Sequence, residues 1–312
     1  MAVRLSSLGD VILTFPFVNE IKRLYPSSRL SFLVKPAFAA AARLHPGIDE
    51  VIEYTETSKD VILTNGYDVI FDLQRNQRTI LLLRSAGAGV YKVRKDSAKK
   101  VLLAAAKINL LKPYIPVYKR YLNALKEFNP EANTDYTETR GMLLKENQYK
   151  GKDYILVSPS SRHFTKRYPA EMLAELLKDV KKKIILTGDA NETDMKVCSY
   201  LEKNLHDADN LCGRSDIPGL AGLISGAGLV ICNDSGVLHI AEALGKRTFV
   251  FFGSTVKEFG FYPQLASTAV LENNDVKCRP CTHIGRADCP KKHFRCMTEI
   301  DTSLLKKELL KL

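Results

Sequence analysis

No run in the 312-residue sequence approaches the roughly 20 consecutive apolar residues that a membrane-spanning helix needs. The first ten residues, MAVRLSSLGD, lack the apolar stretch of a secretory signal, and there is no low-complexity tract. With 45% hydrophobic and 26% charged residues, the composition excludes disordered, collagen-like and disulfide-scaffold proteins. We therefore expect a cytoplasmic globular protein whose seven cysteines are free thiols or metal ligands rather than disulfides.

Positive charge is concentrated in one stretch of the chain. Between Arg75 and Arg120 there are 12 Lys/Arg residues and one acid, Asp96, whereas the rest of the chain carries 34 basic and 34 acidic residues. Such a block predicts an anionic partner, which is a phospholipid headgroup, a phosphorylated glycolipid or a nucleic acid. A solvated helix face is the alternative interpretation.

Short apolar runs alternate with helical patterns, which is typical of a parallel α/β fold. The expected strands are 30–34, 51–54, 68–73, 154–159, 183–188, 229–233 and 248–253, and the expected helices are 11–24, 37–44, 169–180, 192–205, 219–227 and 236–244. A polar, weakly periodic segment, 129–150, separates the two series. We expect two Rossmann-like domains, 1–150 and 151–312, that face each other across a ligand-binding cleft.

Three loops carry candidate functional residues, two of them of the types that bind phosphate and one with a candidate base. The strand 229–233 runs into Asp234, Ser235 and Gly236 and then directly into a helix, so backbone N–H groups and a helix dipole point at the sheet edge, where phosphate binds. A plain helix N-cap is the alternative. His239 lies one turn into the same helix, and it either reaches the phosphate or packs in the core.

The other two loops follow the strand at 154–159 and the first strand. In SPSSRHFTKRYP (158–169), hydroxyl groups precede Lys166 and Arg167, so this loop is suited to wrap and neutralise a diphosphate. A polar loop between a strand and a helix, with charges on the surface, is the alternative interpretation. In SSLGD (6–10), Asp10 stands at the start of a helix, which stabilises its ionised form. Asp10 is a candidate base if it points into a cleft and a helix cap if it does not.

Four cysteines lie within 19 residues near the C-terminal end, with the spacing Cys278-x2-Cys281-x7-Cys289-x6-Cys296. This spacing indicates a structural zinc or iron site, with reduced free cysteines as the alternative.

Taken together, these segments resemble glycosyltransferase family 9, the ADP-heptose:lipopolysaccharide heptosyltransferases. The matching pieces are collinear and cover nearly the whole chain: RLSSLGDVILTFPFVNEIKRLYP, VIFDLQRNQRT, VSPSSRHFTKRYPAEMLAELL, LCGRSDIPGLAGLISGAGLVICNDSGVLHIAEALG, FVFFGST and CRPCTHIGRADCPKKHFRCM. The pairing of an N-terminal SSLGD with a C-terminal NDSGxxH is the specific feature. The family often has tryptophan after the Lys-Arg pair, and this chain has Tyr168 there.

The resemblance implies a GT-B fold, with the acceptor on the N-terminal domain and the nucleotide-sugar on the C-terminal domain. It implies inverting transfer without a catalytic metal. Asp10 then becomes the general base, and Lys166 neutralises the leaving diphosphate. The implied donor contacts are Ser160, Ser161, Thr165, Asp189, Glu192, Asp234, Ser235, Gly236 and His239, and the implied acceptor contacts are Gly9, Gln74, Arg75 and Arg78.

The implied partners are ADP-heptose, an anionic glycolipid of the lipopolysaccharide inner core (lipid A-Kdo or heptose), and the inner face of the cell membrane, to which the protein would bind peripherally. Leu102, Leu103, Ile108, Leu110 and Leu111 lie among the lysines of the basic stretch, so this stretch is suited to lie in the membrane interface. Two alternatives remain at this point. One is a transferase for another nucleotide-sugar or acceptor, or a nucleotide-sugar epimerase; the other is a basic, metal-containing nucleic-acid-binding protein.

Overall fold

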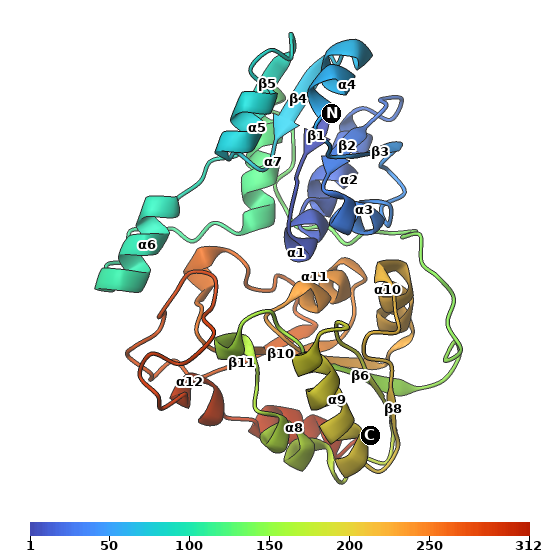
Figure 1. The fold of residues 1–312 in the computed structure, drawn as a ribbon, viewed down its shortest axis with the longest axis vertical. Coiled ribbons are helices and arrows are strands. Elements are labelled where there is room, and N and C mark those ends of the chain that lie inside the picture. Colours follow the sequence, from blue (N-terminus) through green and yellow to red (C-terminus); the bar gives the residue numbers. More distant parts are fainter. The chain divides into compact units, whose positions relative to one another are not determined.

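Two parallel β-sheets organise the chain, for which the computed structural model describes residues 1–312 (Figure 1). Contacts divide it into unit 1, residues 1–96 and 115–143, and unit 2, residues 97–114 and 144–312. The sequence predicts one boundary near 150, whereas here part of the basic stretch, 97–114, packs with the second unit. No helix has the length and apolar character needed to cross a membrane.

Unit 1 is built on a five-stranded sheet with the order β3-β2-β1-β4-β5, in which all neighbouring strands are parallel. Its strands are β1 (Ala2–Val3), β2 (Ser31–Val34), β3 (Glu50–Glu53), β4 (Val69–Asp72) and β5 (Gly89–Lys92). Its helices are α1 (Leu8–Ile12), α2 (Phe15–Leu24), α3 (Pro36–Ala42), α4 (Ser58–Asn65), α5 (Gln77–Leu82) and α7 (Val117–Phe128).

The first helix expected from the sequence is split in two. Its apolar positions Phe15, Val18 and Ile21 are buried as predicted, but α1 ends at Ile12 and α2 begins at Phe15. Pro16 has no N–H to continue the hydrogen-bond pattern of α1, so a new helix starts around it. The break leaves α1 as a short turn directly after β1.

Unit 2 is built on a six-stranded parallel sheet with the order β11-β10-β9-β6-β7-β8. Its strands are β6 (Tyr154–Ser158), β7 (Lys183–Leu186), β8 (Ala208–Asn210), β9 (Leu229–Asn233), β10 (Thr248–Phe252) and β11 (Thr268–Glu272). Its α-helices are α6 (Ser97–Ala106), α8 (Ala170–Leu177), α9 (Glu192–Asn204), α10 (Ile217–Gly226), α11 (Gly236–Ala243), α12 (Arg295–Thr298) and α13 (Ser303–Leu309), and its 3-10 turns are η1 (Phe164–Lys166) and η2 (Lys257–Phe259).

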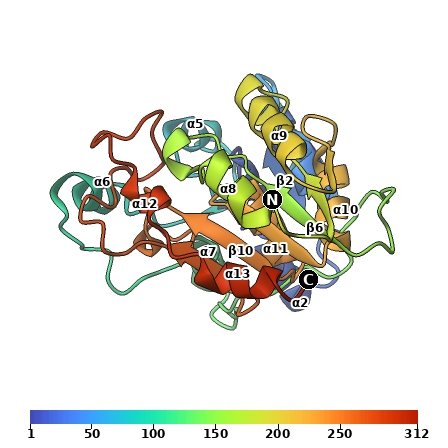
Figure 2. The same cartoon turned by 90° about the horizontal axis from the view of Figure 1, so that it is seen from below.

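The core of unit 2 joins the sheet to the C-terminal helix. Leu305 and Leu309 of α13 belong to the same buried cluster as Ile155 of β6. Figure 2 shows α13 beside the sheet of unit 2. Tyr168, at the position where the family often has tryptophan, stacks on Phe251 with ring centroids 3.9 Å apart and planes 10° apart. Tyr168 therefore has a packing role in this chain.

The stretch 97–114 leaves the sheet of unit 1 and packs on unit 2. Leu103 and Leu111 form a buried cluster with Phe259. Lys107 donates hydrogen bonds from Nζ to the carbonyl oxygens of Cys278, at 3.0 Å, and Pro280, at 2.5 Å. Both views accordingly show α6 next to the segment that carries the cysteines (Figures 1 and 2).

Each sheet has one place where the chain reverses the direction in which it adds strands. In unit 1 this switch point lies between β1 and β4, and in unit 2 it lies between β6 and β9. In folds of this type, ligands bind at the carboxyl edge of the sheet next to the switch point, where loops of neighbouring strands diverge to opposite faces. The α/β fold with two Rossmann-like halves, expected from the sequence, is confirmed.

Candidate functional site

Asp10 is a carboxylate at the switch point of unit 1, and its side chain is 16% exposed. It lies in the first turn of α1, which directly follows the loop after β1. Its Oδ1 pairs with Nη2 of Arg4 at 2.7 Å, and its Oδ2 accepts hydrogen bonds from the backbone N–H of Ser7, at 3.2 Å, and from the Ser7 hydroxyl, at 2.9 Å. Arg4 also donates to the carbonyl oxygen of Leu73 at 2.8 Å and lies over the ring of Tyr121.

The environment of Asp10 keeps it ionised. Burial by itself raises the pKa of this carboxyl, but the Arg4 guanidinium and the two Ser7 hydrogen bonds outweigh burial and hold the pKa below 3.8. A second cation, which sequence reasoning did not single out, lies nearby. Burial lowers the pKa of Lys95, and so does the charge of Arg4, while Asp72 and Asp10 oppose the shift. Asp10 is thus a carboxylate among cations, able to take a proton as charge develops.

The four residues predicted to contact the acceptor lie near the carboxyl edge of the unit 1 sheet, and their side chains have different partners. Gln74, directly after β4, accepts the backbone N–H groups of Leu5 and Ser6 with Oε1, at 3.1 and 3.3 Å. It therefore ties the two loops of the switch point together. Gly9 lies within α1.

The two arginines of this group differ in how they are held. Arg75 has a left-handed backbone (φ 42°), and its guanidinium donates to the carbonyl oxygen of Val93 at 3.0 Å. Arg78 is exposed and lies over the ring of Tyr54, 5.7 Å from its centroid. Arg75 is therefore the more firmly held of the two side chains, and the acceptor roles of all four residues stay predictions.

Asp234 and Lys166 form the corresponding ion pair at the switch point of unit 2. Asp234 directly follows β9, and Lys166 closes the 3-10 turn η1 in the loop after β6. Lys166 Nζ lies 2.7 Å from Asp234 Oδ2, and the side chains are 14% and 5% exposed. Burial raises the pKa of Asp234, but Lys166 and a hydrogen bond from Thr255 lower it below 3.8. The sequence placed both residues in the donor site without indicating that they pair.

Five buried hydroxyl groups in the loops and strand ends of this edge have no hydrogen-bond partner within the protein. They belong to Ser158, Ser160, Thr187, Ser235 and Ser254, which follow or end β6, β7, β9 and β10. Unsatisfied buried hydroxyls are costly, so native structures keep them where a ligand or water bonds to them. Ser160 and Ser235 were predicted as donor contacts, whereas Thr187 and Ser254 were not. Their signal in the sequence is only a hydroxyl residue directly after a buried apolar strand.

The close approach of two loops at this edge depends on Gly188. A Cβ atom at this position would lie 2.5 Å from the Ser160 hydroxyl and 2.9 Å from Cys212 Sγ. The loops after β6 and β7 can therefore meet only because residue 188 has no side chain.

Thr165 and Ser161 hold the loop after β6 in place. The Thr165 hydroxyl oxygen accepts the backbone N–H of Arg286 at 2.9 Å. The carbonyl oxygen of Ser161 accepts a hydrogen bond from Arg167 Nε at 2.5 Å. The Thr165 bond ties this loop to the segment that carries the cysteines, whereas the Ser161 bond is internal to the loop. The donor roles of both residues stay predictions.

Acidic residues follow β7, as expected, but the buried one is Asp194 rather than the predicted Asp189 or Glu192. Asp194, in the first turn of α9, accepts the backbone N–H of Asp189 at 3.1 Å and lies 3.7 Å from Arg167. Burial, and next the charge of Asp194, raise the pKa of Asp189. Glu192 is exposed and pairs with Lys196 at 2.5 Å. Asp194 was missed by sequence reasoning because nothing but burial distinguishes it from its neighbours.

Helix α11 begins at Gly236 and is buried along most of its length, including His239. Glu242 follows His239 by one turn and accepts the backbone N–H groups of Gln264 and Leu265 with the same oxygen, Oε1, at 2.7 and 3.0 Å. Burial raises the pKa of Glu242 to about 6. This carboxylate therefore anchors the loop 264–265 to the helix whose N-terminus faces the candidate donor site.

The four cysteines of 278–296 do not form a metal centre in this structure. All are free thiols, and no group of three or more cysteine, histidine or acidic side chains converges on a position that could hold a metal ion. Burial raises the pKa of Cys281 and that of Cys296, the latter to about 11. The structural zinc or iron site expected from the spacing is therefore not supported by the geometry, although Cys278, Cys281 and Cys289 lie close enough to Cys296 to raise its pKa.

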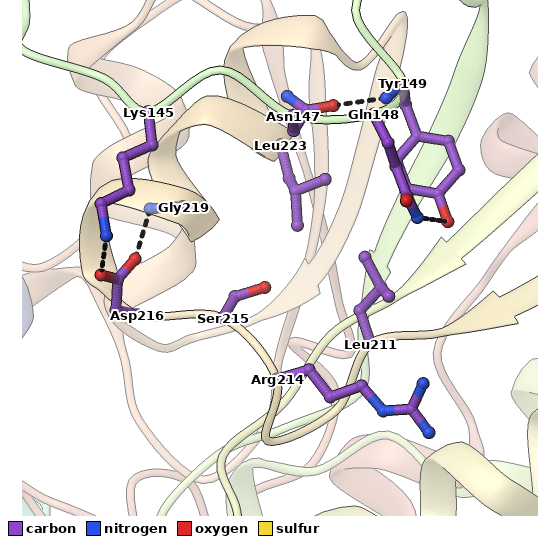
Figure 3. Close-up of a pocket in the computed structure, with 10 residues that line it drawn as sticks. All are labelled: Lys145, Asn147, Gln148, Tyr149, Leu211, Arg214, Ser215, Asp216, Gly219 and Leu223. Carbon is purple, nitrogen blue, oxygen red and sulfur yellow. Dashed lines mark hydrogen bonds and ion pairs between the residues drawn. The ribbon is translucent and has the colours of Figure 1, made fainter.

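A pocket of about 470 Å³ opens elsewhere on unit 2, between the segment before β6 and the loop after β8 (Figure 3). Lys145 and Asp216 form an ion pair at one side of it, and Tyr149 lies at the other. It contains none of the residues predicted from the sequence. Its lining residues are Lys145, Asn147, Gln148, Tyr149, Leu211, Arg214, Ser215, Asp216, Gly219 and Leu223.

With the geometry established, comparison with known proteins identifies the family. Residues 59–291 match the model of glycosyltransferase family 9 (heptosyltransferase). The chain belongs to this family. This family 9 member is 26% identical over 313 residues to lipopolysaccharide heptosyltransferase 1 of Pseudomonas aeruginosa, and the match covers 90% of this chain and 85% of the relative.

Two solved structures show that this family 9 member shares their fold. E. coli ADP-heptose LPS heptosyltransferase II matches with a TM-score of 0.71 and 16% identity, covering 99% of this chain and 98% of that one. E. coli heptosyltransferase WaaC with ADP-2-deoxy-2-fluoro heptose matches with a TM-score of 0.70 and 18% identity, covering 90% and 95%. The GT-B assignment made from the sequence is thereby confirmed.

Replacement of Glu242 by glutamine should stabilise the protein above pH 6. The pKa of Glu242 is about 6 in the folded chain against an ordinary value of 4.5 for an exposed glutamate, so the folded state binds the proton more tightly and stability is lost as the pH rises from 4.5 through 6. Gln Oε1 keeps both backbone hydrogen bonds. We expect Glu242→Gln to raise the free energy of unfolding by about 2 kcal/mol at pH 8 and to have little effect at pH 4.5, as measured by urea denaturation. Equal gains at both pH values would contradict the assignment.

Proposed function

We propose that the protein is an inverting heptosyltransferase that moves heptose from ADP-heptose to an acceptor of the lipopolysaccharide inner core, lipid A-Kdo or heptose. The observation that carries this proposal is the buried Lys166–Asp234 pair among unsatisfied hydroxyls at the switch point of unit 2, in a chain of family 9. The matched relatives that act on lipopolysaccharide support the choice of donor and acceptor.

The donor diphosphate would bind at the carboxyl edge of the second sheet. Gly236 begins α11, so its backbone N–H and those that follow face the phosphate with the positive end of the helix dipole. The hydroxyls of Ser160 and Ser235 donate hydrogen bonds that nothing else in the protein uses. Lys166 exchanges part of its contact with Asp234 for the β-phosphate, where negative charge grows as the sugar leaves. The reaction as proposed needs no catalytic metal, because Lys166 and the helix supply the positive charge.

The acceptor hydroxyl is activated on unit 1. As its oxygen forms a bond to the anomeric carbon of heptose, the bond from that carbon to the diphosphate oxygen breaks, and ADP leaves with the electron pair. The hydroxyl proton passes to Asp10. Because the pKa of Asp10 is held low by Arg4 and Ser7, proton transfer accompanies bond formation rather than preceding it. Attack opposite to the leaving group inverts the anomeric configuration.

We further propose that the stretch 97–114 binds the anionic inner face of the cell membrane. It carries four lysines and no acid. Leu103 and Leu111 are buried against unit 2, but Val101, Ile108 and Leu110 are 50–52% exposed. Exposed apolar side chains flanked by lysines fit a lipid interface, because the apolar side chains contact the acyl chains and the lysines contact the anionic headgroups. Peripheral binding of this kind would bring the enzyme to a lipid-anchored acceptor.

Asp10→Asn should abolish transfer while leaving the donor bound. Asparagine keeps the shape of the side chain but accepts no proton, so we expect kcat/KM to fall by about 10²- to 10⁴-fold. The measurement is product formation from ADP-heptose and defined inner-core acceptors, with the anomeric configuration of the product read by NMR. ADP affinity, measured by calorimetry, serves as the control for folding. A folded variant with wild-type turnover would refute the base assignment.

Lys166→Met should weaken both donor binding and turnover. Loss of the cation leaves the growing phosphate charge uncompensated, so we expect kcat to fall about 100-fold or more and the Kd of ADP to rise. Lys178→Met, which removes an exposed lysine paired with Glu175 on α8, is the matched control and should behave as wild type. Unchanged kinetics for Lys166→Met would remove its role in neutralising the leaving group.

Replacement of Val101, Ile108 and Leu110 together by serine should weaken binding to anionic vesicles about tenfold, because their partial burial in lipid is lost. Cosedimentation with phosphatidylcholine vesicles, with and without phosphatidylglycerol, measures this. Leu143→Ser, at a similarly exposed leucine of unit 1, is the control. If phosphatidylglycerol does not increase vesicle binding of the wild-type protein, or if the triple variant binds as well as the wild type, the membrane proposal is wrong.

A further inference from the structure

Thr255 is a buried residue next to the Lys166–Asp234 pair. It ends the matching piece FVFFGST, but sequence reasoning assigned it no role. It follows β10 and is 4% exposed. Its hydroxyl donates to Asp234 Oδ2 at 2.8 Å, and this is the same oxygen that lies 2.7 Å from Lys166 Nζ. One carboxylate oxygen therefore holds two donors, one charged and one neutral.

The backbone of Thr255 is fixed from the other side by Arg279. Arg279 Nη2 donates to the carbonyl oxygen of Thr255 at 2.9 Å, and the same nitrogen pairs with Glu272 at 2.7 Å. Nη1 donates to the carbonyl oxygen of Asn273 at 2.5 Å. The Arg279 side chain is 4% exposed, so these contacts form in a low-dielectric interior where they are strong. The cysteine-rich segment, through Arg279, thereby sets the position of Thr255.

We propose that Thr255 is a positioning residue for heptose transfer, holding Asp234 in place through its hydroxyl so that Asp234 aims Lys166 at the donor diphosphate. This rests on the role proposed above for Lys166. When the diphosphate draws Lys166 away, Asp234 loses its main compensating charge. The Thr255 hydroxyl then remains as a donor to the buried carboxylate, which keeps Asp234 oriented to receive Lys166 again after ADP leaves.

The test removes only the hydroxyl. Thr255→Val has nearly the same shape, and we expect kcat/KM for ADP-heptose to fall about 10- to 100-fold, the effect of one buried hydrogen bond to a charged group. Thr255→Ser restores the hydroxyl and should recover activity to within about threefold of wild type by the same argument. Thr248→Val is the control, since it removes a buried hydroxyl at the opposite end of β10 and should leave the kinetics unchanged.

A double-mutant cycle separates positioning from general destabilisation. If Thr255 acts through Asp234 and Lys166, Thr255→Val should have less than about a twofold further effect in the Lys166→Met background. Should Thr255→Val unfold below the assay temperature, as read by thermal melting, Thr255→Ala replaces it in the cycle.

The outcomes are distinguishable from those of the proposed function. If Thr255→Val has wild-type activity while Lys166→Met is impaired, the role of Thr255 alone is overturned. The same follows if Thr255→Val lowers kcat/KM by the same factor in the Lys166→Met background as in the wild type. It also follows if Thr255→Ser does not restore activity. Full activity of Lys166→Met overturns both the role of Lys166 and the positioning that depends on it.

Discussion

At the switch point of each sheet, a carboxylate that is largely shielded from solvent pairs with a cation from a neighbouring segment. Arg4 compensates Asp10 in unit 1, and Lys166 compensates Asp234 in unit 2, both at 2.7 Å. Loss of one partner of such a pair leaves a buried charge alone, which typically costs about 3–5 kcal/mol. The pairs therefore hold the loops of the candidate site in one conformation. The charged residues proposed to act in the reaction are the same ones whose pairing stabilises the fold.

Much of this arrangement could be predicted from the sequence, because it follows from local patterns. Apolar runs such as 229–233 and 154–159 appear as β9 and β6 almost to the residue. The loops that were predicted to bind ligand leave the sheets at their switch points, because a parallel strand order puts the carboxyl ends on one edge. The strands β5, β8 and β11 were not predicted, since their burial patterns are mostly intermediate rather than clearly apolar.

The partners of the charged residues could not be read from the sequence. Arg4 directly follows the first strand, yet only its packing against Tyr121 and Leu73 turns it toward Asp10. Thr255 ends the piece FVFFGST, but it lies 21 residues from Asp234, and nothing in that piece indicates the hydrogen bond between them. The cysteine spacing indicated a metal site, but no group of three or more possible ligands has the geometry to hold a metal ion. Long-range geometry decides these points, and no local pattern encodes it.

The assignment of 97–114 to unit 2 has a consequence for dividing the chain. The polypeptide passes from one unit to the other three times, after residues 96, 114 and 143. A fragment that stops at 143 would carry Leu103 and Leu111 without Phe259 to cover them, and a fragment that starts at 144 would lack the helix that covers Phe259. No single cut in the chain therefore yields two continuous segments that each contain one whole unit.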